Sequence, residues 1–140
     1  MSQGEIARTP AEEALFSHLR RELAAHPGVR LALLFGSRAR GSAREASDVD
    51  VAVLAPKVDL LALGAVLSRA TGETVNLLSL ADPGVPLLEE LLRDGILLRE
   101  GAPGALGQWR SHALMDLELD RPWYERMRDA WLDHVARHGV

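Results

Sequence analysis

Cysteine is absent from this chain of 140 residues. No disulfide framework and no thiolate metal site can therefore form, and a reducing cytoplasm is the expected compartment. No apolar run follows a basic stretch near the start, so we expect no secretory signal. The apolar run at residues 87–92 is interrupted by Glu89 and Glu90, and no segment approaches the roughly 20 apolar residues of a membrane span. The sequence predicts a soluble protein without a membrane partner.

Positive charge is also scarce. The formal net charge is −4 and the sequence pI is near 5.7, which is the wrong sign for a protein that binds chiefly the nucleic-acid backbone. Nucleic acid is therefore not expected as a direct partner. Hydrophobic residues make up 47% of the chain, enough for one compact core, whereas 140 residues are too few for two ordinary domains.

The hydrophobic pattern predicts an α/β fold in which strands alternate with helices. A capping box formed by Thr9 and Glu12, with Pro10 between them, predicts the start of a helix over residues 9–26. The Thr hydroxyl can cap the free N–H groups, the Glu carboxylate can bond back to the Thr N–H, and proline is tolerated in the first turn because its missing N–H is not needed there. Short apolar or alternating runs predict the strands, and helical spacing predicts the later helices. The expected strands cover residues 30–35, 48–54, 73–80 and 96–98, and the expected helices cover residues 60–69 and 82–93.

A helical tail follows the breaker-rich joint at residues 101–104, and we expect it to bend or split at Arg121-Pro122. Its apolar positions are Leu114, Leu117, Trp123, Met127, Trp131 and Val135. This stripe could pack back on the sheet, which is the favoured interpretation, or be shared with a partner. An oligomer is a separate open alternative. The three tryptophans, Trp109 among them, are interpreted as packing or interface anchors.

Two acidic residues stand two apart on a predicted strand. Asp48 and Asp50 should point to the same face, where their carboxylates would repel each other unless water or a cation lay between them. A solvated strand face is the usual alternative for such a pair. Mg²⁺ prefers oxygen ligands and often uses one or two carboxylates together with substrate phosphates. The pair is thus a candidate metal site for phosphoryl-transfer chemistry.

Gly36 and Ser37 stand where the first apolar strand ends. Glycine allows the backbone to approach a ligand closely, and the N–H groups and the Ser hydroxyl can bind phosphate oxygens. Arg38, Arg40 and Arg44 add positive charge nearby. Each of these signals is weak alone, and the prediction depends on their conjunction.

Ten residues separate Ser37 from Asp48, and this Gly-Ser, ten-residue gap, Asp-x-Asp arrangement resembles the signature of the DNA-polymerase-β-like nucleotidyltransferase superfamily. Within it, Phe-Gly-Ser-Arg-Ala-Arg-Gly followed by Ser-Asp-x-Asp is similar to the minimal nucleotidyltransferase (MNT) family. Many members of that family are antitoxins paired with HEPN-domain ribonuclease toxins. The resemblance covers residues 29–80, and extends more loosely through residues 93–101 and the helical tail.

The resemblance implies a nucleotidyltransferase fold with a short mixed sheet flanked by helices. Residues 1–100 would form the core, and residues 101–140 would be a C-terminal helical extension of the same domain. It further implies ATP as substrate, two Mg²⁺ ions, and transfer of a nucleotidyl group to a hydroxyl. In the antitoxin branch that hydroxyl belongs to a tyrosine of the HEPN toxin, which becomes AMPylated.

Carried onto this chain, the resemblance implies that Gly36 and Ser37 hold the β- and γ-phosphates and that Asp48 and Asp50 bind the metal. Arg38 and Arg40 would be secondary phosphate contacts at most. Catalysis would then come from positioning and from neutralisation of charge on the phosphates and the departing pyrophosphate.

The chain departs from the family pattern at Asn76, where a third carboxylate is expected. Asparagine offers a neutral oxygen to a metal, but it has no charge with which to stabilise a deprotonated nucleophile. Asp59 and Asp82 could substitute, although both are better interpreted as helix N-caps. A degenerate antitoxin that neutralises its toxin by binding is therefore an alternative. A small-molecule transferase ranks lower, because no second domain is present to build an acceptor pocket.

Overall fold

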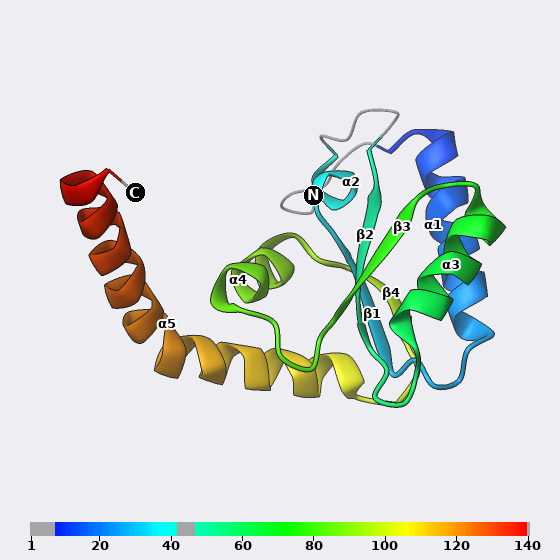
Figure 1. Ribbon diagram of the computed structural model, residues 1–140. Coiled ribbons are helices and arrows are strands. Elements are labelled where there is room, and N and C mark those ends of the chain that lie inside the picture. The colour runs from blue at the N-terminus through cyan, green and yellow to red at the C-terminus, as the bar shows by residue number, and fades with distance from the viewer. Residues whose placement is uncertain (1–7, 42–46, 140) are drawn as a thin grey trace.

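A computed structural model describes residues 8–41 and 47–139, and it contains a four-stranded mixed sheet (Figure 1). The strands are β1 (Leu31–Phe35), β2 (Val49–Leu54), β3 (Val75–Ser79) and β4 (Ile96–Glu100), in the spatial order β3-β2-β1-β4. The central strand β1 runs antiparallel to both β2 and β4, whereas β2 and β3 are parallel. The α/β class and the mixed sheet expected from the sequence are confirmed.

Helices cover both faces of the sheet. In Figure 1, α1 (Pro10–Ala24) and α3 (Leu60–Thr71) lie on one side, and α4 (Val85–Asp94) and the first half of α5 (Ala105–His138) lie on the other. Alternate residues of each strand serve the two sides, because successive side chains point to opposite faces. The α1/α3 side buries Phe16, Leu19, Leu23, Val49, Val51, Val53 and Leu67, and the α4/α5 side buries Leu31, Leu33, Phe35, Ala52 and Leu91.

Side chains cap the starts of α1 and α3, whereas α2 (Ser37–Arg40), α4 and α5 each begin at a glycine N-cap. The hydroxyl of Thr9 accepts the Glu12 N–H and the Glu12 carboxylate accepts the Thr9 N–H, so the predicted capping box is present. Asp59 caps α3 by accepting the N–H groups of residues 61 and 62. The prediction that α4 begins at Asp82-Pro83 is wrong. Its N-cap is Gly84, because residues 79–84 first cross from the end of β3 to the face that α4 covers.

The C-terminal tail is one continuous helix that bends part of the way along its length (Figure 1). Pro122 lies inside it, where a proline removes a helical hydrogen bond and kinks the axis. Of the predicted apolar positions only Leu117 packs in the core, as the last buried residue of the helix, and Leu114 before it is 58% exposed, which corrects that prediction. Beyond it Trp123, Met127 and Trp131 are more than half exposed, so for them the favoured interpretation is wrong.

No helix within residues 8–41 and 47–139 combines the length and the apolar character that crossing a membrane requires.

Candidate functional site

The two acidic residues of the Asp-x-Asp motif lie at the start of β2. Val49, Val51 and Val53 are buried on the α1/α3 side, so alternation directs Asp50 to the α4/α5 side. Asp50 stands opposite Phe35 of β1 and opposite Asn76 of β3. Asp48 is exposed and precedes the strand, whereas Asp50 is half-buried.

Asn76 joins the two carboxylates. Its Nδ2 donates to Oδ2 of Asp48 at 3.0 Å, and a side-chain hydrogen bond from Asn76 also stabilises charged Asp50. The parallel register of β2 and β3 explains this contact, because it places Asn76 directly beside Asp50. The structure thus brings together Asp48, Asp50 and Asn76, the three residues that the sequence singled out as catalytic.

Burial and repulsion dominate the electrostatics of Asp50. Desolvation raises the pKa of this carboxyl above its usual value, and the hydrogen bond from Asn76 opposes that rise. The negative charges of Asp48 and Glu90 raise the pKa further, while Arg40 lowers it. A divalent cation between Asp48 and Asp50 would remove much of the repulsion, since an opposite charge favours the ionised form.

The Gly-Ser turn closes over Asp50. Gly36 has φ +79°, and a Cβ added there would lie 2.5 Å from Oδ2 of Asp50. Only glycine allows both this backbone conformation and this approach. Ser37 opens the four-residue helix α2 (Ser37–Arg40), and Ala39 of that helix is buried in the core. The predicted nucleotide-binding turn and the predicted metal ligands are therefore adjacent.

The two arginines of the motif have different surroundings. Arg38 is largely buried, and its guanidinium donates to the Ser47 carbonyl at 2.6 Å and to the Glu73 carboxylate at 2.8 Å. It thus ties α2 to the segments that precede β2 and β3. Arg40 forms an ion pair with Glu90 at 2.8 Å. A direct contact of either arginine with phosphate stays a prediction, and Arg44 lies outside the described residues.

Glu90 is a site residue that the sequence did not reveal. It lies on α4, and its Oε2 accepts the Gly36 N–H at 3.1 Å as well as binding Arg40. One sequence clue was present. Glu90 lies three positions after Leu87 and next to Leu91, and these two leucines pack against the sheet. An acid at that helical spacing faces inward. Its partner is 54 residues away in sequence, so only the tertiary fold identifies it.

The described residues offer a cation few protein ligands. Among residues 8–41 and 47–139, no group of three or more His, Cys, Asp and Glu side chains is arranged to hold a metal ion. Two carboxylates with a neighbouring amide fit a Mg²⁺ ion that takes its remaining ligands from water and from substrate phosphates. They do not fit a closed structural metal site.

Comparisons with known proteins agree with this geometry. A family model described as "Polymerase beta, Nucleotidyltransferase" matches residues 17–102. A solved toxin-antitoxin structure with AMP-PNP is similar, with 25% identity and a TM-score of 0.64 over 86% of this chain and 98% of that one. A substituted form of the MntA-HpeT toxin-antitoxin is 26% identical, with a TM-score of 0.62 over 85% of this chain and 97% of that one.

A further solved structure extends the likeness at the level of fold. It is a tri-AMPylated HEPN toxin in complex with an MNT antitoxin from Shewanella oneidensis, with 23% identity and a TM-score of 0.58 over 86% of this chain and 96% of that one. No protein of curated function matches the sequence significantly. Because the family model spans more than half of the chain and covers the Gly-Ser turn, the Asp-x-Asp strand and Asn76, the protein belongs to the polymerase β-type nucleotidyltransferase family.

Proposed function

We propose that this protein is a Mg²⁺-dependent nucleotidyltransferase that uses ATP to transfer AMP to a hydroxyl group. The observation that carries the proposal is the close approach of Gly36 to Asp50, with Asp48 and Asn76 beside them. A triphosphate held by the Gly36 N–H and the Ser37 hydroxyl would lie next to two carboxylates able to hold its metal ion. Burial, and to a lesser degree the charges of Asp48 and Glu90, raise the pKa of Asp50, which supports this assignment because a nearby cation would favour the ionised carboxylate.

The proposed reaction has a simple balance of bonds. The acceptor oxygen forms a bond to the α-phosphorus of ATP, and the bond from that phosphorus to the oxygen bridging to the β-phosphate breaks. The products are an AMP ester and pyrophosphate, and the hydroxyl proton is released. When bound, Mg²⁺ supplies charge neutralisation for the phosphates and the leaving pyrophosphate. The residues of this chain supply position: Asp48 and Asp50 orient the ligands, and Gly36 allows the close contact.

The proposed acceptor is a tyrosine hydroxyl of a cognate HEPN toxin, so the protein would act as an antitoxin. Support comes from the toxin-antitoxin structure with AMP-PNP and from the AMPylated HEPN toxin with its MNT antitoxin.

The test is transfer of label from α-labelled ATP. Incubation with Mg²⁺ and a HEPN toxin encoded beside this gene should label the toxin, and Asp48→Ala should abolish the label. Asp82→Ala is the matched control, since Asp82 is an exposed acid at the opposite end of the sheet, and it should keep full transfer. An unlabelled toxin with the unsubstituted protein would reject the proposed activity.

The amide of Asn76 favours a second candidate function, in which the protein neutralises the toxin by binding alone. Its Nδ2 bonds Asp48, and an amide cannot take the proton of a nucleophile as a carboxylate can. In this case Asp50→Ala would still protect cells from the toxin, and Asn76→Asp would create a transfer activity that the parent lacks. If Asp50→Ala loses protection, binding alone is insufficient.

A further inference from the structure

The second half of α5 repeats the pattern that buries the first half. Ala105, Trp109, Ala113 and Leu117 face the core, and Trp123, Met127, Trp131 and Val135 follow each of them by 18 residues. Eighteen residues are five helical turns, so both sets lie on the same side of the helix. In this later set Trp123 is 59% exposed, Met127 52% and Trp131 57%, whereas Val135 is partly buried. We call these four residues the distal stripe.

The two ends of the distal stripe carry different polar side chains, carboxylates at the start and imidazoles at the end. Asp116 and Asp120 precede it on the same side of the helix, one and two turns before Trp123. His134 and His138 end it: the His134 ring stacks on Trp131 with centroids 6.0 Å apart, and the two His rings are 4.5 Å apart. The stripe therefore begins with two carboxylates, is apolar in its middle and ends with two imidazole rings, which can donate N–H hydrogen bonds to carboxylates.

We propose that the distal stripe pairs with the same stripe of a second copy of this chain, in antiparallel orientation around a two-fold axis at Met127. That axis places Trp123 against the partner's Trp131, and Leu119 against the partner's Val135. It also places Asp120 against the partner's His134, and Asp116 against the partner's His138. The arrangement is isologous, so every favourable contact occurs twice.

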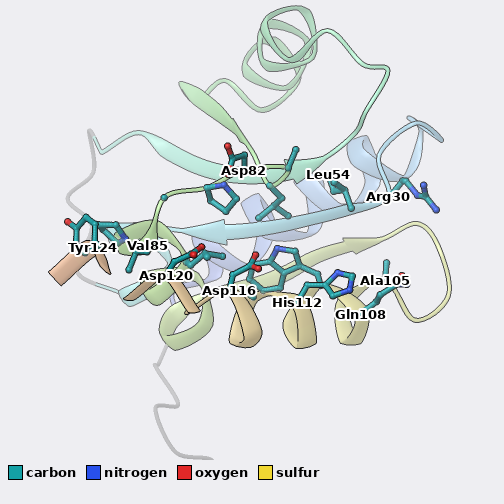
Figure 2. A pocket seen from close by; sticks show the side chains of 18 of the residues that line it. Arg30, Leu54, Asp82, Val85, Ala105, Gln108, His112, Asp116, Asp120 and Tyr124 are labelled. Carbon is teal, nitrogen blue, oxygen red and sulfur yellow. The ribbon is translucent and has the colours of Figure 1, made fainter. Parts of the chain in front are cut away.

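A groove in each protomer would receive the last turns of the partner helix. The groove has a volume of about 1060 Å³ and lies between the first half of α5 and the segment that leads into α4. Figure 2 shows Asp116, Asp120 and Tyr124 along α5, with Asp82 on the opposite side. The carboxylates of Asp116 and Asp120 can accept hydrogen bonds from imidazole N–H groups, and Tyr124 offers an aromatic face for the ring. The groove therefore matches the histidine end of the stripe.

This pairing does not depend on the proposed transferase activity. Among the described residues, the site around Asp50 lies at the ends of β1 and β2 nearest α2, whereas the groove contains Arg30 and Leu54 at the opposite ends of those strands. Two protomers joined through the distal stripe would keep both nucleotide sites accessible to an acceptor. Failure of either proposal therefore leaves the other open to its own test.

Solution mass gives the first test. Light scattering of the whole protein should report twice the chain mass of 15.2 kDa, and Met127→Asp should return it to the single-chain mass with a loss of affinity of at least about a hundredfold. Met115→Asp is the matched control. Met115 is a methionine of the same helix and is 57% exposed, but it lies outside the distal stripe, so this variant should stay dimeric. A single-chain mass up to about 0.1 mM protein would overturn the pairing.

A charge exchange tests the orientation. Asp120→His alone should weaken the dimer several-fold, because it removes the carboxylate that accepts from the partner's His134, and the added change His134→Asp should restore the pair in reversed form. Restoration follows only if residue 120 faces the partner's residue 134. A double variant that stays monomeric would overturn the antiparallel register, provided its far-ultraviolet circular dichroism matches that of the parent.

Crosslinking locates the axis. Because the chain contains no cysteine, Met127→Cys places one thiol at the proposed axis, and a short bismaleimide should join two chains in high yield. Met115→Cys should give little product. Equal yields, or a Met127→Cys protein that joins only to an added HEPN toxin, would overturn self-pairing and assign the stripe to a different partner.

Discussion

The carboxylate of Glu90 accepts the N–H of Gly36 at 3.1 Å and holds the guanidinium of Arg40 at 2.8 Å. An anionic side chain of α4 thus occupies a backbone donor that the proposed triphosphate would use. Its charge also contributes to the raised pKa of Asp50. Nucleotide binding would therefore have to displace Glu90 from Gly36.

Glu90→Gln should tighten binding of Mg²⁺ and a non-hydrolysable ATP analogue by several-fold. The substitution removes a negative charge from the phosphate position and weakens its hold on the Gly36 N–H, since charged acceptors form stronger bonds than neutral ones. Isothermal titration calorimetry measures the effect. Glu89→Gln is the control, because Glu89 pairs with Arg121 of α5, and it should leave the affinity unchanged. Weaker binding by Glu90→Gln would mean that Glu90 is itself a ligand of the metal.

Gly36→Ala should lower the free energy of unfolding by more than Gly104→Ala does. Both glycines have φ near +79°, but an added Cβ meets Oδ2 of Asp50 at Gly36 and nothing within 4 Å at Gly104. The control should thus lose about 1 kcal/mol for backbone strain alone, and Gly36→Ala about 1 to 3 kcal/mol. Urea denaturation compares them. Equal losses would mean that the turn can move away from Asp50 without cost.

Asp50→Asn should raise the melting temperature of the metal-free protein at neutral pH. The folded-state pKa of Asp50 is raised above its model value of 3.8, so the folded state loses stability as pH rises from about 3.8 through that pKa. The asparagine variant escapes this loss, and its advantage should vanish below pH 3.8. Asp82→Asn, at an exposed position, should show no comparable gain. A variant less stable than the parent at neutral pH would contradict the raised pKa.

Arg38→Met should destabilise the fold by about 1.5 to 3 kcal/mol, the range for bonds to charged groups. The side chain is 10% exposed and joins Ser47 to Glu73, so its loss leaves those acceptors without the guanidinium. Arg93→Met is the control, because that arginine is 66% exposed in its pair with Asp94, and the change should stay within about 0.5 kcal/mol. Thermal or urea unfolding decides whether Arg38 stabilises the fold.

Local signals predicted much of the fold and of the site. The capping box at Thr9 and the alternation through Val49, Val51 and Val53 depend on neighbours in sequence, so the first helix and the strands were predicted correctly. The Gly-Ser turn lies against the Asp-x-Asp strand, while the roles of these residues stay a prediction. Asp82 misled because an Asp-Pro pair resembles a helix start, whereas Gly84 caps α4. The contacts of Glu90 with Gly36 and of Arg38 with Glu73 join segments far apart in the chain. Patterns along the sequence do not reveal such pairs.

The exposed half of α5 shows a different limit. Periodicity identified Trp123, Met127 and Trp131 as apolar positions, but the same period serves a helix that packs on its own core and a helix that packs on another chain. The difference lies in the core, which ends at Leu117. The sequence alone does not show at which residue of α5 the contact with the core ends.

Calorimetry with Mg²⁺ and a non-hydrolysable ATP analogue tests the central claim most directly, because Gly36, Asp48 and Asp50 are proposed to form one triphosphate site. The unsubstituted protein should bind the analogue with measurable heat only when Mg²⁺ is present, and Asp50→Ala should lose that binding while Asp82→Ala keeps it. No heat from the unsubstituted protein, or unchanged binding by Asp50→Ala, would contradict the account.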